Sequence, residues 1–362
     1  MDNGRAYAEP IWHLQSHLVR AERQIPMITD GFDFLTGKLI NTFTGENGIT
    51  LFLLFMTAFV SALVAYWKVE EHKSVRDFLS FALPKEVIMH PSARADLLFY
   101  ITKRLIMPFL LIPAGILFVT TVGFGTNQLI SWIFQIHGPL LQGDTPWWVL
   151  VLFTLSMLVA YDISYYLYHV AQHKVPFLWE LHKVHHSAEV LVGITKDRVH
   201  PLDDLINRAW DGVIPGICFG LWSVIALDPV ELTVFGINVY AMRNLLMMDF
   251  VRHTHYKISF GPLDNYILSP HWHQLHHSAD PRHYDKNFGL LLSIWDRIFG
   301  TALVPDPNED MKFGLLDRDK DDYQSLFGLY LLPLKKMGGH IAKWFGHRPA
   351  PVNPPPTEPT QP

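Results

Sequence analysis

The chain has 362 residues, 49% of them hydrophobic and only 17% charged, and this composition with a mean hydropathy of +0.14 favours a membrane protein over a soluble one. A net charge of −5 without a long Lys/Arg run gives no electrostatic footprint for nucleic acid, so no nucleic-acid partner is expected. The single cysteine, Cys218, excludes intrachain disulfides, zinc ribbons and cysteine-ligated iron–sulfur clusters, so any metal site must use nitrogen or oxygen ligands.

Three long apolar runs predict membrane-spanning helices, at residues 49–67, 105–124 and 147–161. The first run has nineteen residues without a charge, the length that a helix needs to cross a hydrocarbon core of ~30 Å. Because 48 mostly polar residues precede it, this run lies too deep in the chain to be the core of a cleaved signal peptide. Two shorter runs, 212–227 and 232–242, are marginal in length and could form either a spanning or a re-entrant hairpin.

The loop between the first two spans, residues 68–104, carries seven Lys or Arg residues and is therefore expected in the cytoplasm. The chain returns to that side after the third span. Since the hairpin crosses twice or not at all, the segments before Trp210 and after Met248 are predicted on the same cytoplasmic side.

Histidines are concentrated in those two segments, because thirteen of the twenty lie between residues 169 and 283. Three sets have i, i+3 or i+4 spacing, which places each set on one helix face with neighbouring Cβ atoms about 5–6 Å apart. Imidazole suits zinc, copper, iron or nickel, and eight such ligands are too many for one tetrahedral ion. We therefore predict an all-α integral membrane bundle, with three or four spans plus a hairpin, and a cytoplasmic histidine-rich helical cap holding a di-metal site. The sets are His169 and His173, then His182, His185 and His186, then His273, His276 and His277.

The order of these sets resembles the fatty acid hydroxylase and sterol desaturase superfamily of integral-membrane di-iron enzymes, and the resemblance covers roughly residues 85–332. Five blocks carry it in the family's order: "DISYYLYHVAQH", "FLWELHKVHHS", "RVHPLDD", "SPHWHQLHHS" and "DKNFGLLLSIWDRIFGT". The resemblance implies that the eight histidines above are iron ligands, with His253 of "RHTHYK" as the ninth and His255 as a candidate tenth.

The spans and the resemblance together predict five regions. These are a polar N-terminal segment at 1–48, an N-terminal transmembrane region at 49–145, a fatty acid hydroxylase-like catalytic domain with the membrane hairpin at 146–305, a cytoplasmic extension at 306–345 and a disordered Pro-rich tail at 346–362.

Carboxylates near the histidines are expected to accept ring N–H groups and fix their tautomers. Asp162 is the first candidate, because it precedes His169 by seven residues and so lies two helical turns away on the same face, where it would steady His169 or His173. An Asp near a membrane interface is more often solvated or a helix cap, so four others are weaker candidates. These are Asp203, Asp204, Asp249 and Asp285.

Three further histidines have local interpretations. His200 precedes Pro201 and is either a metal ligand, a donor to one, or the cap of a helix. His271 and His283 are not required by the family pattern and are predicted to lie on the surface.

The expected function is that of a membrane-bound, non-heme di-iron oxygenase with two iron ions and O₂ as co-substrate. It would use two external electrons to hydroxylate or desaturate an unactivated C–H position of a sterol, fatty acyl or isoprenoid lipid from the bilayer. The chain has no cysteine set for a ferredoxin, no cytochrome b5-type heme block and no dinucleotide motif, so a separate electron donor of ferredoxin or cytochrome b5 type is expected. The expected location is a bacterial inner membrane or the endoplasmic reticulum, with the histidine motifs facing the cytoplasm.

Two other classes also place histidines in a membrane protein. A metal transporter would hold its polar ligands inside the spans near the bilayer midplane, whereas these histidines cluster outside the predicted spans. A zinc-dependent membrane hydrolase would use an HExxH motif, which the sequence lacks. Within the family, hydroxylation, desaturation, demethylation, ether-lipid cleavage and aldehyde deformylation all stay open at this point.

Overall fold

The computed structural model describes residues 46–69, 74–106, 108–136, 139–141, 145–226, 233–234, 237–238, 249–318 and 320–346. All but residues 46–48 of the predicted polar N-terminal segment, all but residue 346 of the predicted Pro-rich tail, and most of the second arm of the predicted hairpin lie outside these residues. The chain divides into two compact units, 1–55 and 56–362, and the second unit contains all of the predicted metal ligands.

The regular secondary structure of the described residues is helical, as predicted, except for one short ladder in which β1 (Thr233–Val234) pairs antiparallel with β2 (Ile237–Asn238). In order along the described residues, the first helices are α3 (Glu46–Val69), α4 (Val75–Ala82), α5 (Lys85–Ile88), α6 (Pro91–Ile106), α7 (Pro108–Phe134) and α8 (Trp147–Lys174). They are followed by α9 (Pro176–His186), α10 (Pro201–Asp211), α11 (Ile214–Ile225), α13 (Asp249–Arg252), α14 (Pro270–His276), α15 (Ile294–Ile298) and α16 (Leu326–Trp344). Short 3₁₀ segments are η1 (Gly193–Asp197), η2 (Gly261–Asn265), η3 (Pro281–His283) and η4 (Lys320–Gln324).

The apolar runs of the sequence coincide with α3, α7, α8 and α11. Within the part of the chain whose side chains are described, α8 is the one helix that is long and apolar enough to cross a bilayer by length and composition. Residues 56–67 of α3 form a shorter apolar stretch. The number of spans and their orientation therefore stay predictions.

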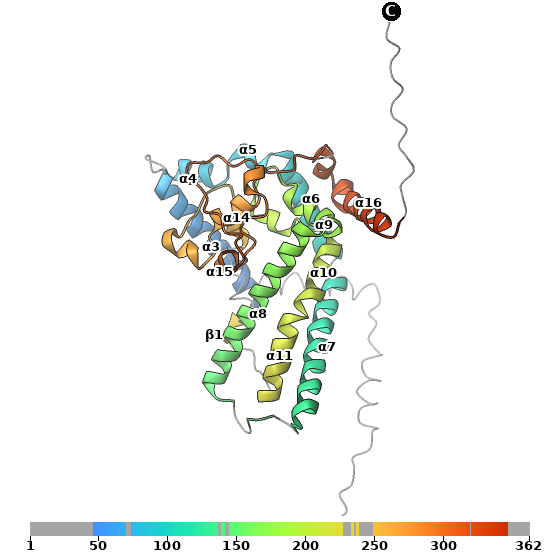
Figure 1. Cartoon of the computed structure of the whole chain (residues 1–362). Helices are drawn as coiled ribbons and strands as arrows, with labels where there is room; N and C mark the ends of the chain where they lie inside the picture. Colours follow the sequence, from blue (N-terminus) through green and yellow to red (C-terminus); the bar gives the residue numbers. More distant parts are fainter. Residues whose placement is uncertain are drawn as a thin grey trace, which may run out of the picture. The chain divides into compact units, whose positions relative to one another are not determined.

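Helices α7, α8 and α11 run side by side (Figure 1), and α11 packs against both of the others. A Cβ added to Gly220 of α11 would lie 2.5 Å from the Gly123 carbonyl oxygen of α7, so this close approach requires glycine. On the other face of α11, the indole nitrogen of Trp222 donates to the Ser156 hydroxyl of α8 over 2.7 Å.

The polar half of α8 continues into a group of shorter helices that contains the histidine sets. A cluster of buried apolar side chains joins α6, α9, η4 and α16, and Val184, between two histidines of α9, belongs to it. The predicted C-terminal extension thus packs directly on the helix that carries the "HKVHH" set. The members of this cluster are Ala95, Phe99, Val184, Tyr323 and Leu329.

Candidate metal centre

The structure brings nine of the ten predicted histidine ligands into two adjoining groups. Within each group, one ring nitrogen of every histidine lies within 4.8 Å of those of the others. The five-histidine group consists of His169, His173, His182, His186 and His276. The four-histidine group consists of His185, His253, His273 and His277. The two groups are neighbours, because the rings of His186 and His277, one from each, have centroids 4.7 Å apart.

Local sequence explains why these side chains converge. α8 ends at Lys174, and Pro176 begins α9 at a position where its missing N–H costs nothing. The i, i+3, i+4 spacing then puts His182, His185 and His186 along one side of α9, and α14 repeats the pattern. Because 3.6 residues make one turn, consecutive residues point about 100° apart around the helix axis. His185 and His186, adjacent in the chain, therefore enter different groups.

The inward-facing nitrogens of the five-histidine group lack protein partners. In the described part of the chain, the Nε2 atoms of all five members are buried and accept or donate no hydrogen bond. A buried polar atom without a partner costs about 1–3 kcal/mol. Five such atoms facing one another are therefore the arrangement expected of a metal ligand set rather than of a hydrogen-bonded core.

The four-histidine group is equally tight. The Nε2 atom of His253 lies 3.2 Å from that of His185 and 3.1 Å from that of His273, and the Nε2 atoms of His273 and His277 are 3.1 Å apart. Two imidazoles bound to one ion through bonds of ~2.0–2.1 Å place their nitrogens about 3 Å apart. The residues present therefore fit a metal ion in both groups.

Backbone carbonyls fix the tautomer of two members. Nδ1 of His169 lies 2.8 Å from the Phe288 carbonyl oxygen, and Nδ1 of His276 lies 2.8 Å from that of Lys286. Since a carbonyl oxygen can only accept, each Nδ1 carries the proton and each Nε2 presents its lone pair to the group interior.

Burial keeps these rings neutral. Removal from water, with the neighbouring imidazoles adding to the effect, holds the pKa of His185 and of His186 well below 6.5. The same causes lower the pKa of His277, and burial lowers that of His276 to about 3. A neutral imidazole is the form that binds a metal, so no proton has to be displaced near neutral pH.

Asp203, one of the weaker candidates in the sequence, is the buried carboxylate beside the five-histidine group. Its Oδ2 lies 3.5 Å from Nδ1 of His182, and its carboxylate accepts from the Tyr168 hydroxyl over 2.7 Å and from the Gln172 amide. Asp285 lies farther away, with 3.8 Å between its Oδ1 and Nδ1 of His173. Sequence spacing could not single out Asp203, because it lies on α10 and outside every histidine set.

Asp162 does not take the position predicted for it. Its carboxylate accepts from the backbone N–H groups of Leu291 and Leu292 and, over 2.7 Å, from the indole of Trp295. It anchors the 291–295 segment to α8 instead of orienting His169. The prediction matched the helix face but overlooked the distance, since seven residues advance a helix by about 10.5 Å.

The four other histidines for which the sequence made a prediction lie outside both groups. Nε2 of His255 is 2.7 Å from the Phe81 carbonyl oxygen. His200 caps α10, because its Nδ1 accepts from the Leu202 N–H and its Nε2 donates to the Tyr330 carbonyl, so the capping alternative is the one observed. The surface prediction for His271 and His283 is wrong, since both are buried. Every residue of α14 is buried, which sequence pattern alone does not reveal.

One cavity reaches both groups. It has a volume of about 300 Å³, and its wall includes three members of the five-histidine group and His277 of the other. The C-terminal extension also contributes to the lining of this cavity, through Leu315, Leu316 and Asp317. A molecule in this cavity can therefore approach both candidate metal positions.

Fold and site together define a class of helical proteins. Its members have an apolar helix of membrane-spanning length and, at the end of that helix, two adjoining all-imidazole groups able to hold metal. Comparison with known proteins gives the family. Residues 154–301, which include all nine grouped histidines, match the model of the fatty acid hydroxylase family, and this part of the chain belongs to that family.

Three relatives illustrate the similarity. Human alkylglycerol monooxygenase is 32% identical over 176 residues, which are 48% of this chain and 34% of the relative. The ornithine lipid hydroxylase of Rhizobium tropici is 29% identical and methylsterol monooxygenase 1 of Rattus norvegicus is 30% identical, each over 158 residues. Those matches cover 44% and 43% of this chain, and 44% and 48% of the relatives. The chain thus spans between a third and a half of the length of these relatives, and no solved structure matches it.

Proposed function

We propose that this protein is a membrane-bound, non-heme di-iron monooxygenase that hydroxylates an unactivated C–H position of a lipid. The observation that carries the proposal is the pair of adjoining imidazole groups that line one cavity, together with the Nε2 atoms of the five-histidine group, which are buried without a hydrogen-bond partner among the described residues. The match of residues 154–301 to the fatty acid hydroxylase family supports iron and lipid chemistry. The names of three relatives are those of lipid monooxygenases or hydroxylases.

When bound, two reduced iron ions would supply the activation of O₂ and the removal of hydrogen from a C–H bond. In the balanced reaction, one oxygen atom of O₂ enters the C–H bond as a hydroxyl group and the other leaves as water, with two electrons and two protons consumed. The protein's own part is to hold neutral imidazoles in place. The Phe288 and Lys286 carbonyls orient His169 and His276, and Asp203 lies beside His182.

The remaining components of the proposal are a lipid substrate, a membrane location and a separate electron donor. The apolar helices α7, α8 and α11 offer a surface from which a lipid can reach the cap. One cysteine leaves no ligand set for an iron–sulfur cluster, so the electrons come from a separate donor of the ferredoxin or cytochrome b5 type. Hydroxylation is favoured over desaturation by the relatives' names alone.

The two alternative classes are weaker. The nine grouped histidines lie at the polar end of α8 and in the helices beyond it, not in the middle of an apolar helix where a transporter would place them. A five-member ligand group is also more than tetrahedral zinc uses, and no HExxH motif is available to supply a catalytic base.

The test uses purified protein in detergent with a chemical or protein reductant, a lipid extract and isotopically heavy O₂. We expect two irons per chain, lipid-dependent O₂ uptake and a lipid product that carries one heavy oxygen. The His182→Ala variant should form no product. A product two hydrogens lighter without label would replace hydroxylation by desaturation, and stoichiometric zinc from iron-replete cells would contradict the di-iron proposal.

A further inference from the structure

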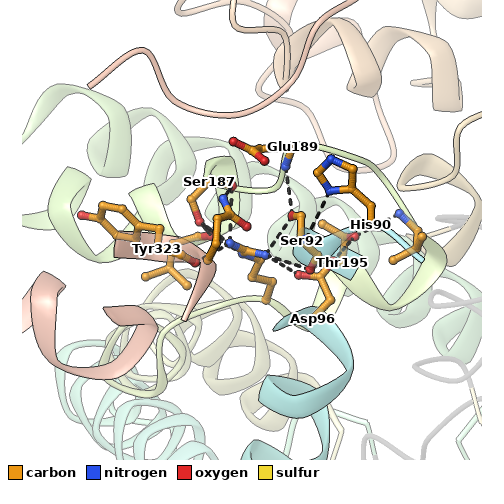
Figure 2. A network of polar contacts seen from close by, with 11 residues as sticks. His90, Ser92, Asp96, Ser187, Glu189, Thr195 and Tyr323 are labelled. Carbon is orange, nitrogen blue, oxygen red and sulfur yellow. Dashed lines mark hydrogen bonds and ion pairs between the residues drawn. The ribbon is translucent and has the colours of Figure 1, made fainter. Parts of the chain in front are cut away.

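A buried arginine outside the ligand set is bonded to the helix end that supplies both groups. Arg198, which follows η1, is 1% exposed and contacts three separate parts of the chain. Figure 2 labels its partners Asp96, Ser187 and Tyr323. Its Nε donates to the Val184 carbonyl over 3.0 Å, and its Nη2 donates to the Ser187 hydroxyl over 2.8 Å. These contacts fall on the last turn of α9, where backbone carbonyls have no partner within the helix.

The segment that Arg198 holds carries one ligand for each group. His185 belongs to the four-histidine group and His186 to the five-histidine group, and both lie between Val184 and Ser187. A shift of this turn would therefore displace a nitrogen in both groups at once. Mutating the partners that orient metal ligands typically lowers metal affinity about 10- to 100-fold.

The other side of the guanidinium is fixed by residues beyond the family-matched region. Nη1 forms an ion pair with Asp96 of α6 over 2.6 Å, and Asp96 also accepts from the Thr195 hydroxyl. Nη2 donates to the Tyr323 carbonyl of η4 over 2.8 Å, and the neighbouring Gln324 amide donates to the Ser187 carbonyl over 2.9 Å. The last turn of α9 is thus anchored to two elements outside the family-matched region, namely α6 before residue 154 and η4 after residue 301.

We infer that Arg198 is a positioning residue for the metal centre. By bonding the end of α9 to α6 and η4, it fixes the positions of His185 and His186. A planar guanidinium with five donors suits this position, because its N–H groups diverge towards three segments. Lysine at 198 would keep the charge beside Asp96, but its three donors sit on one atom and cannot reach Val184, Ser187 and Tyr323 together. The inference rests on the metal centre of the proposed function but not on its oxygen chemistry.

Titration of the metal-free full chain with cobalt(II), followed by the visible absorption of the bound ion, tests the inference without any turnover. Cobalt is a probe for nitrogen ligand sets. We expect Arg198→Lys to weaken cobalt binding about 10- to 100-fold and to change the spectrum of both bound ions. Gln324→Leu, which removes a single hydrogen bond to the Ser187 carbonyl, should give a smaller change in the same direction. This variant tests the same inference if Arg198→Lys fails to fold.

The matched control is Lys103→Met in the same helix α6. Lys103 forms a partly buried ion pair with Asp204, 2.6 Å apart, and donates to the Asp197 carbonyl over 3.3 Å, but it bonds neither Val184 nor Ser187. It should lower thermal stability yet leave the cobalt affinity and spectrum unchanged. Unaltered cobalt binding in Arg198→Lys, or an equal loss in Lys103→Met, would overturn the inference. Cobalt binding by a wild-type protein that contains no iron and oxidises no lipid would instead contradict only the proposed function.

Discussion

Two backbone carbonyls decide the chemistry of individual histidines at this site. Phe288 and Lys286 accept from Nδ1 of His169 and His276, which leaves Nε2 of each ring free to bind metal. The i, i+3, i+4 spacing brings rings to one face, but it does not say which nitrogen faces inward. That choice depends on the 286–288 segment, which lies more than a hundred residues from His169.

Helix α14 offers a matched pair of substitutions at the scale of one residue. His273 and His271 are both buried on this helix, but only His273 belongs to a ligand group. We expect His273→Ala to lose the metal of the four-histidine group, and hence about half of the iron, while His271→Ala keeps the full amount. Elemental analysis of protein purified from iron-replete cells gives the answer, and equal losses would mean that the ligand set is wrong.

At the scale of elements, the segment between α14 and α15 is held by two buried carboxylates with separate tasks. Asp162 of α8 accepts from the Leu291 and Leu292 N–H groups. Asp296 of α15 accepts from the Phe288 and Gly289 N–H groups, each over 2.8 Å. Burial raises the pKa of Asp296, and the hydrogen bonds that its carboxylate accepts from Thr301, Gly289 and Phe288 oppose that rise. Only Asp296 acts on the residue whose carbonyl orients His169.

Substitutions of the two carboxylates should therefore have different effects on stability and on iron binding. Asp162→Asn and Asp296→Asn should each lower the free energy of unfolding by about 1–3 kcal/mol, because an amide cannot accept all the hydrogen bonds of the carboxylate. Asp296→Asn should in addition weaken iron binding about tenfold or more, since it releases Phe288. Thermal unfolding and iron titration of both variants separate the effects. A larger loss of iron in Asp162→Asn would restore that residue to the ligand-orienting role that the sequence suggested.

At the scale of the whole molecule, the histidine groups draw on both sides of the predicted hairpin. α8 and α9 come before it, and α13 and α14 come after it. The groups form only if both segments lie on one face of a membrane, and the basic 68–104 loop predicts that this face is cytoplasmic.

Exposed positions test this sidedness. Lys174, at the end of α8, and Val304, after α15, are 56% and 70% exposed. In a Cys218→Ser background, Lys174→Cys and Val304→Cys should both react with an impermeant thiol reagent from the cytoplasmic side only. Intact cells and inverted vesicles provide the two directions of access. Labelling of the two cysteines from opposite sides would rule out a metal centre shared by the two segments.

The sequence by itself determined the local features of this protein. Apolar runs located α3, α7, α8 and α11, and histidine spacing located the ligand faces of α8, α9 and α14, because helical periodicity depends only on neighbouring residues. The family resemblance added His253 of "RHTHYK", which no spacing rule would have linked to the other sets.

Only the tertiary structure decided how these features combine. The division into five and four histidines, the burial of His271, the capping by His200, and the positions of Asp203, Asp162 and Arg198 all depend on contacts between distant segments. Arg198 and Asp96, for example, are 102 residues apart in the chain. Such partners leave no periodic trace in the sequence, because their pairing is set by how the helices pack and not by the spacing along any one of them.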